Sequence, residues 1–345
     1  MDFGFCRRVI GLAQLIIFVS LLPFSVQAAG AEGSGSQTVL AGDIGDQISL
    51  NSRPIRVIRA DEAGTDPAYF YEQFGSEPVI IKGVYSDSKL LKGLNSDTVT
   101  TLFKGQELDA YEKHSGQRVA ISADTFLEDI RKGVSRYNVV DHPIGKSPFA
   151  KKIGAPAFLN DNWLVNSGMN TDRYELSLIF SARGTFTPLH VDSFGMQAWM
   201  YLVYGKKHWV MFPPNQVPAV FDPEFKRFYN PRVDPASSFP LAPYAKNYVA
   251  TIEAGDLIFF PPGWAHQVVT EEESFGLGGS IVNEFLMPES VKSWNIDRSY
   301  SEAGDLDLKK LIENLAPFRV RTERGEKRVR EALERTERWD LESSR

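Results

Sequence analysis

Two short motifs constrain this sequence more than any other feature. The first is Thr187-Pro-Leu-His190-Val-Asp192, and the second is Gly255-Asp-Leu-Ile-Phe-Phe-Pro-Pro-Gly-Trp-Ala-His266. Side chains alternate along a strand, so a strand through the first motif places His190 and Asp192 on one face, within reach of one ion. Two imidazoles and one carboxylate are the ligands of a facial Fe(II) site, which leaves three coordination positions open. The motifs therefore predict that His190, Asp192 and His266 are catalytic metal ligands.

Other potential ligands fit this site less well. Asp256 follows a glycine at the start of an apolar run, which is the pattern of a turn residue. His208 falls on the opposite strand face from its neighbour Lys207, so we expect a packing or surface role. His114 and His142 lie outside the expected barrel strands. We leave these four side chains out of the metal site.

A lysine after the first motif suggests a second ligand. Strand parity directs only one of Lys206 and Lys207 inward, and Lys207 shares a face with the apolar residues 209 and 211. A cation inside an apolar barrel is what the distal carboxylate of a 2-oxo dicarboxylate needs as a partner. Thr187 adds a hydroxyl to the same carboxylate if Pro188 breaks the strand alternation. We therefore expect Lys207 and Thr187 to bind a cosubstrate.

The middle of the chain reads as a β domain. Short apolar runs alternate with turn residues at a density typical of a sandwich or barrel. Between two of these runs, Tyr204-Gly-Lys206 predicts a hairpin turn. The proline-rich stretch from Asn215 to Lys246 predicts an irregular insertion between strands, where substrate contacts are common. The expected strands are Tyr174–Phe180, Ala198–Val203, His208–Phe212, Tyr248–Ile252, Leu257–Phe260 and Gly278–Val282.

Helical patterns flank this domain on both sides. Pro67–Phe74 and Ser122–Arg131 have the spacing of short amphipathic helices, and Pro78–Gly83 that of a buried strand. After Pro288 a helix is expected around residues 306–315, ended or kinked near Ala316 by the proline that follows. The last segment, from Arg319, mixes Glu and Arg and predicts a charged helix that is either solvated or a homodimer contact.

These patterns divide the 345 residues into five segments. We expect a signal peptide at 1–28, a flexible linker at 29–54, an N-terminal α/β flank at 55–136, the barrel at 137–290 and a charged helical tail at 291–345. The signal assignment rests on two arginines before an apolar run and on a small-residue cleavage site at Ala28. An uncleaved anchor is the alternative, and it is the only membrane contact expected.

Composition sets limits on compartment and partners. The signal pattern indicates the secretory pathway, meaning an endomembrane lumen or secretion, or the periplasm in a bacterium. The single cysteine, Cys6, lies inside the expected signal, so no disulfides are expected in the mature chain. A formal net charge of −6 argues against a dedicated nucleic-acid binder, because phosphate contacts need clustered Lys and Arg.

The two motifs together resemble the JmjC-domain Fe(II) and 2-oxoglutarate dioxygenases of the cupin superfamily. The likeness is strongest over His190–Pro214 and Gly255–Val269, and nearest to the arginine demethylase and lysyl hydroxylase subfamily. The resemblance implies a mainly β fold, a double-stranded β-helix or jelly roll with flanking N- and C-terminal helices. It also implies 2-oxoglutarate as cosubstrate and O2 as oxidant, with Tyr137 a further residue of the 2-oxoglutarate pocket beside Lys207 and Thr187.

The chain also departs from this family. Met200 stands where the nearest subfamily carries an asparagine close to the cosubstrate. The hydrogen-bonding residue expected on the strand after His266 is either Ser280 or Ile281, with Asn283 nearby. The signal pattern separates this chain from relatives that act on histones or splicing proteins in the nucleus.

These observations support one leading function and two alternatives. We expect an oxygenase that hydroxylates a protein side chain, or demethylates it through hydroxylation, and releases succinate and CO2. The first alternative is a non-catalytic cupin-like binding protein, suggested by Met200. The second is a metal cupin that modifies a small molecule without 2-oxoglutarate.

Overall fold

The structure is a computed structural model that describes residues 50–112, 117–133, 136–165, 167, 175–300 and 308–343. All of these belong to the compact unit Val39–Arg345. The expected signal peptide at 1–28, the linker up to residue 49 and His114 lie outside the described residues. Residues 51–54, expected to end the linker, instead form the first strand, β1.

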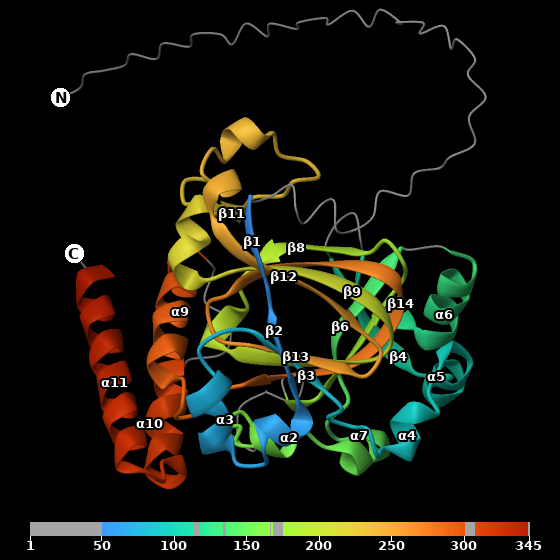
Figure 1. Cartoon of the computed structure of the whole chain (residues 1–345), viewed down its shortest axis with the longest axis horizontal. Helices are drawn as coiled ribbons and strands as arrows, with labels where there is room; N and C mark the ends of the chain where they lie inside the picture. Colours follow the sequence, from blue (N-terminus) through green and yellow to red (C-terminus); the bar gives the residue numbers. More distant parts are fainter. Residues whose placement is uncertain are drawn as a thin grey trace, which may run out of the picture. The chain divides into compact units, whose positions relative to one another are not determined.

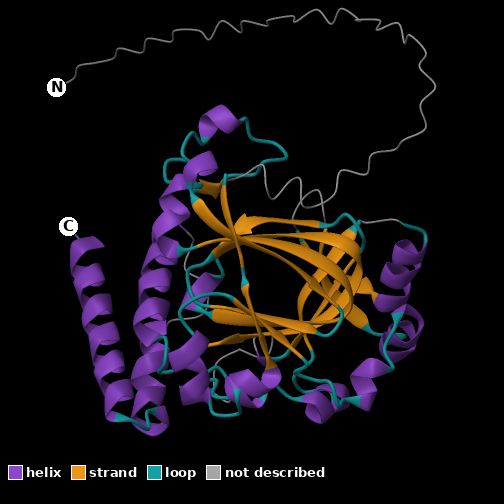
Figure 2. Ribbon diagram, in the orientation of Figure 1, coloured by secondary structure: helices purple, strands orange, loops and turns teal. Residues whose placement is uncertain are grey.

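A single sheet of 12 strands forms the centre of the described structure (Figure 2), and a two-stranded ribbon forms a separate small sheet. The ribbon consists of β10 (Phe221–Asp222) and β11 (Arg227–Phe228). The strands of the large sheet are β1 (Asn51–Pro54), β2 (Arg56–Arg59), β3 (Val79–Lys82), β4 (Glu107–Glu112), β5 (Arg118–Ser122), β6 (Tyr137–Pro143), β7 (Ser177–Ser181), β8 (Phe186–His190), β9 (Gln197–Phe212), β12 (Lys246–Glu253), β13 (Asp256–Phe260) and β14 (Ala265–Ile281).

Two long strands, β9 and β14, give the sheet its closed form. They pair with each other along their whole length. The first half of β9 also pairs with β13 and its second half with β12. Likewise, β14 pairs first with β8 and then with β7. Each long strand therefore takes part in two layers, as expected for a jelly roll, and the predicted mainly β fold is confirmed.

The hairpin predicted at residues 204–206 is wrong. Residues 197–212 form one continuous strand that bends at Gly205, where φ is +92°. The backbone there passes so close to β14 that an added Cβ would lie 2.2 Å from the carbonyl oxygen of Glu273. The register between β9 and β14 also shifts beside this point. Glycine therefore permits a close approach and a bend rather than a turn.

The interior of the barrel is lined by one face of these strands. Met200, Trp209, Met211, Ile258 and Phe260 belong to one buried cluster on this inner face. Residues of alternate parity, such as Trp199 and Phe259, pack outside against the N-terminal flank. The alternation of side chains along β9 thus separates barrel interior from outer core.

Helices border the strands at two edges, with α4–α6 at one and α9–α11 at the other (Figure 1). The predicted helices at 67–74 and 122–131 are confirmed as α3 and α6. The helices are α2 (Ala60–Ala63), α3 (Pro67–Phe74), α4 (Lys89–Lys92), α5 (Ser96–Phe103), α6 (Ala123–Arg131), α7 (Pro148–Ile153), α9 (Met287–Tyr300), α10 (Leu308–Arg319) and α11 (Glu323–Ser343).

The C-terminal helices form a second core with the barrel end. Leu311 and Ile312 of α10 and Val329 and Ala332 of α11 are buried in one cluster with Phe194, which follows the first motif. The charged helix is therefore amphipathic, and its apolar side is covered within the chain. Of the end or kink predicted near Ala316, the end does not occur, because α10 continues through Pro317 to residue 319.

The insertion between β9 and β12 has little regular structure, as predicted. It contains the 3-10 helices η3 (Pro214–Ala219), η4 (Ala236–Ser238) and η5 (Ala242–Tyr244) and the short ribbon. Its apolar residues cover the outer side of β8 and β9. Among the described helices, none is both long and apolar enough to cross a membrane.

Candidate metal site

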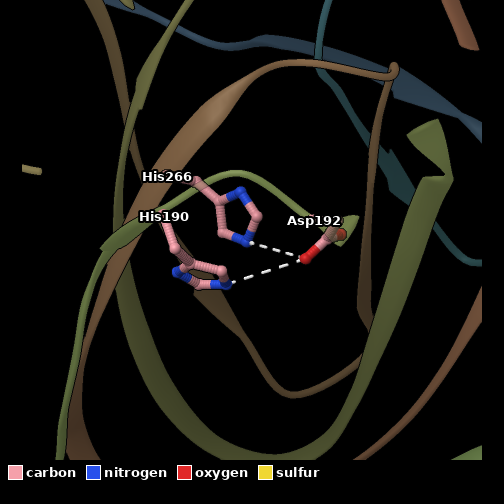
Figure 3. Close-up of side chains that lie close together, drawn as sticks. All are labelled: His190, Asp192 and His266. Atoms are coloured by element: carbon pink, nitrogen blue, oxygen red, sulfur yellow. Dashed lines mark ion pairs between the residues drawn. The ribbon is translucent and has the colours of Figure 1, made fainter. Parts of the chain in front are cut away.

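The three predicted metal ligands lie together inside one end of the barrel (Figure 3). His190 is the last residue of β8, and His266, the second residue of β14, is its direct partner across the two strands. Asp192 lies two residues beyond β8, just before the short 3-10 helix η2 (Ser193–Gly195). All three ligand atoms lie within 4.8 Å of one another. Strand pairing therefore brings the two separate motifs to one point.

Backbone hydrogen bonds set the orientation of both imidazoles. His190 Nδ1 lies 2.8 Å from the carbonyl oxygen of Pro188, and His266 Nδ1 lies 3.0 Å from that of Trp264. A carbonyl oxygen only accepts hydrogen bonds, so both rings carry their proton on Nδ1. Both Nε2 atoms are turned toward Asp192, as Figure 3 shows, and in a neutral ring with its proton on Nδ1 this nitrogen is free to bind a metal.

The geometry matches that of ligands around a single cation. Asp192 Oδ1 lies 3.6 Å from His190 Nε2 and 3.8 Å from His266 Nε2. Two ligand atoms that each lie about 2 Å from one ion are separated by roughly 3–4 Å. Two neutral nitrogens and one carboxylate oxygen form the donor set suited to Fe(II). The residues present therefore fit the predicted iron.

Burial keeps one of these histidines neutral. Only 5% of the His266 side chain is exposed, against 40% for His190 and 25% for Asp192. Burial, reinforced by the neighbouring His190 ring, lowers the pKa of His266 to about 4. A neutral imidazole is the form that binds a metal. The exposed side of the site, around His190 and Asp192, leaves access for other ligands.

Lys207 is buried in the barrel, as strand parity predicts. Its Nζ donates hydrogen bonds to Ser181 Oγ and to Thr270 Oγ1, both at 3.0 Å. Burial alone lowers the pKa of Lys207 to about 7. Within the described residues no carboxylate forms an ion pair with it. In the charged form this buried ammonium therefore lacks a countercharge, which the carboxylate of a ligand would supply.

Three polar residues around this lysine were not predicted from the sequence. Ser181 and Thr270 accept its hydrogen bonds, and Ser181 Oγ in turn donates to Asn138 Oδ1 at 2.7 Å. Thr270 could have been found from the sequence, because it lies four residues after His266 and so on the same strand face. Asn138 and Ser181 come from β6 and β7, whose pairing gives no local signal.

Thr187 reaches the inner face through an irregularity in β8. His190 pairs with His266, but Val268 pairs with Thr187 rather than with Pro188, so the register shifts between them. Paired residues point to the same side of a sheet, and Val268 belongs to the inner cluster. The break in alternation that we considered at Pro188 thus occurs. No hydrogen bond between Thr187 and Lys207 is present among the described residues.

The other expected cosubstrate residues are placed differently. Tyr137 is half-buried against the outer core, with the Arg136 guanidinium 5.1 Å above its ring, while its neighbour Asn138 faces the lysine site. Asn283 lies beyond β14, and its amide donates to the backbone oxygen of Asp161 and accepts from Phe285. Both side chains therefore have structural partners away from Lys207.

The register between β14 and β9 decides between Ser280 and Ile281 as the inward-facing residue after His266. Ser280 pairs with Ala198 of the inner cluster, whereas Ile281 is buried in the outer core. Ser280 is therefore the residue that faces inward. Met200 also points inward, and its Cε lies 2.7 Å from where a Cβ of Gly276 would be.

The rejected candidates have other roles. Lys206 forms a surface ion pair with Glu253 at 3.0 Å. Asp256 forms an ion pair with Lys82 at 2.8 Å and also accepts a hydrogen bond from a backbone N–H, as a turn residue does. His208 faces away from the barrel interior, and its Nδ1 lies 3.0 Å from Thr251 Oγ1.

Sequence comparison places this site in a known family. The profile of the cupin-like domain family matches residues 72–285, which include both motifs and most of the barrel. This match covers more than half of the chain. The chain belongs to the cupin-like domain family. The long strands β9 and β14 and the three predicted metal ligands all lie within the matched range.

Curated relatives of this cupin-like domain include named oxygenases. A 2-oxoglutarate and iron-dependent oxygenase, JMJD4 of Homo sapiens, is 30% identical over 138 residues, which is 38% of this chain and 32% of the relative. The Arabidopsis thaliana arginine-specific demethylase JMJ20 is 26% identical over 184 residues, or 48% of this chain and 39% of the relative. The chain spans about a third of the length of these curated relatives.

Proposed function

We propose that this chain is an Fe(II)- and 2-oxoglutarate-dependent oxygenase that modifies a side chain of a protein substrate. One observation carries the proposal: the barrel that holds His190, Asp192 and His266 also buries a lysine, Lys207, with no carboxylate partner among the described residues. A facial triad alone suits several metal reactions. A buried cation beside it favours a cosubstrate that carries its own carboxylate.

Separate groups of residues would bind the iron and the cosubstrate. His190, Asp192 and His266 would hold iron on one side, and the remaining positions stay open to ligands. Lys207, supported by Ser181 and Thr270, would bind the distal carboxylate of 2-oxoglutarate. Bound iron would supply the activation of O2, so that one oxygen atom enters the substrate and the other enters succinate as CO2 leaves. The apolar inner cluster would exclude water from this chemistry.

A protein substrate is supported by the names of the relatives. These include an arginine-specific demethylase and a JmjC domain-containing histone demethylation protein of Caenorhabditis elegans, 26% identical over 180 residues. The second covers half of this chain but only 15% of the relative. Whether this chain leaves a hydroxyl group on its target or removes a methyl group through hydroxylation depends on the side chain that it accepts.

The first test is succinate release by the purified chain without residues 1–28, supplied with Fe(II), ascorbate and 2-oxoglutarate. We expect turnover that disappears in His190→Ala. The Lys207→Met variant should keep iron but lose 2-oxoglutarate binding, while Lys206→Met, a change at the partly exposed neighbour, should retain both. Iron binding without any 2-oxoglutarate binding by the wild type would contradict the proposal and identify a cupin-like binding protein instead.

The proposed compartment is the secretory pathway, or the periplasm in a bacterial source. Its support is the sequence pattern of residues 1–28 alone, because the relatives and the described residues do not bear on it. Sequencing the N-terminus of the protein recovered from such a compartment tests this. A mature chain that still begins at residue 1 would contradict cleavage.

A further inference from the structure

A groove of about 1080 Å³ runs beside the metal site. Its walls are α9, α11, the start of the insertion and the turn between β13 and β14. Val191, the residue between the two ligands of the first motif, lines it, and so does Trp264, whose carbonyl oxygen orients His266. The groove therefore adjoins residues next to the metal ligands in the chain, while none of the three ligands lines it.

The apolar lining of the groove suits an extended chain. Tyr248 and Trp264 meet edge to face, with ring centroids 5.1 Å apart, at the end of the groove nearest the barrel. Prolines from η3 and from the Pro261–Pro262 turn contribute further rigid apolar surface. Grooves lined by aromatic side chains recognise extended, proline-containing segments, because such segments are already ordered before they bind.

The groove is lined by more positively than negatively charged side chains. Four of its lining cations, Arg53, Lys246, Lys292 and Arg335, form no ion pair within the described part of the chain. They come from β1, β12, α9 and α11, so the fold rather than the local sequence gathers them. A chain with a net charge of −6 has thus collected unpaired positive charge at one place.

The acidic residues at the groove already have partners. Glu77 accepts a hydrogen bond from Tyr248 Oη at 3.1 Å, and Glu331 lies 4.0 Å from Lys327 on the same helix. The negative charge of Glu289 raises the pKa of Arg328, another lining residue, and so opposes the lowering caused by burial. The lining carries five cations against these three acids, so an anionic ligand complements the remaining positive charge.

A buried hydroxyl also faces this groove without a partner. Ser293 of α9 is 4% exposed, lines the groove and makes no hydrogen bond through Oγ. A buried polar atom without a partner is destabilising, typically by about 1–3 kcal/mol. A ligand backbone in the groove would supply the missing hydrogen bond. This observation is independent of the charges.

We propose that the groove between the barrel mouth, α9 and α11 binds an extended, acidic, proline-containing segment of the protein substrate. This names the class of substrate, so it rests on the oxygenase function proposed above. The four unpaired cations would bind carboxylates of the segment, the aromatic residues would contact its prolines, and the target side chain would enter the open side of the metal site.

The test is binding of a fluorescein-labelled peptide of alternating Glu and Pro, measured by anisotropy, beside a Gln-Pro peptide of equal length. We expect the acidic peptide to bind more tightly and to lose affinity as salt is raised. The single change Arg335→Glu should weaken its binding by about threefold to tenfold. Arg330→Glu is the matched control, because Arg330 is exposed on the same helix but does not line the groove.

Equal affinity for both peptides would overturn the proposal, as would an equal loss in Arg330→Glu and Arg335→Glu. Thermal melts of each variant show whether it is folded. The oxygenase function is tested separately, by measuring succinate release. His190→Ala should abolish this release and leave peptide affinity unchanged. Peptide binding without turnover in the wild type would refute the oxygenase alone, whereas turnover without acidic-peptide binding would refute the groove proposal alone.

Discussion

Replacing Lys207 with methionine should make the metal-free protein more stable at neutral pH. The pKa of this lysine falls from 10.5 to about 7 because the side chain is fully buried. Each pKa unit corresponds to about 1.36 kcal/mol, so at pH 7 the buried lysine destabilises the fold by roughly 4 kcal/mol. Methionine has a similar length and no charge to desolvate.

Part of this gain is offset by lost hydrogen bonds. Lys207 donates to Ser181 and to Thr270, and each such bond contributes about 1 kcal/mol. We therefore expect a net stabilisation of about 2 kcal/mol at pH 7. Lys206→Met, which removes only an exposed ion pair with Glu253, should change stability by about 1 kcal/mol or less.

The pH dependence gives this prediction its specific signature. Between pH 7 and 10.5 the unfolded chain holds a proton on Lys207 that the folded chain has lost. Wild-type stability therefore rises with pH across this window, by about 1.36 kcal/mol per unit from this group. The advantage of Lys207→Met should shrink accordingly and be close to zero near pH 9.

The assay is urea unfolding of both proteins in the presence of a metal chelator, at several pH values between 7 and 9.5. Similar m-values would show that the two unfolding transitions expose similar surface. A Lys207→Met variant that is less stable than the wild type at pH 7, or a difference that does not vary with pH, would refute the reasoning. Once both proteins are loaded with Mn²⁺, saturating 2-oxoglutarate should add further stability to the wild type only.

Two further predictions follow from the same structure. Asp192→Ala should abolish Mn²⁺ binding measured by calorimetry, whereas Asp256→Ala should retain it, because Asp256 pairs with a lysine outside the site; equal loss in both would contradict the assigned carboxylate. Gly205→Ala should destabilise the protein by about 3 kcal/mol or more, because its Cβ would collide with the backbone of β14. Gly133→Ala, also at positive φ but with open space around it, should cost only about 1 kcal/mol, and similar values for both would refute the role of close approach.

The metal ligands could be predicted because their geometry is local. His190 and Asp192 are two residues apart, and although β8 ends at His190, the backbone of Asp192 is still extended, so the period of two continues to it. The alternation of side chains along a strand also predicted that Lys207, and not Lys206, points into the barrel. In the structure Lys207 is buried, and Lys206 forms an ion pair with Glu253 at the surface. Such patterns need no knowledge of which strands pair.

Features that depend on pairing between distant strands could not be read in this way. Asn138 and Ser181 meet Lys207 only because β6, β7 and β14 are neighbours in the sheet. The bend at Gly205 looked like a hairpin because glycine marks both turns and close approaches. What distinguishes them is the carbonyl of residue 273 on the opposite strand, which no local window contains.

The choice of partners around Lys207 connects stability with function. A buried carboxylate in place of Ser181 or Thr270 would pair with the ammonium and stabilise the empty barrel, but it would also compete with any anionic ligand. Hydroxyl groups satisfy the N–H donors and add no negative charge. The fold therefore retains a destabilised cation until a ligand carboxylate arrives, and the free energy lost in the empty state is recovered as affinity for that carboxylate. For the same reason, a substitution that stabilises this barrel at Lys207 is expected to remove its cosubstrate.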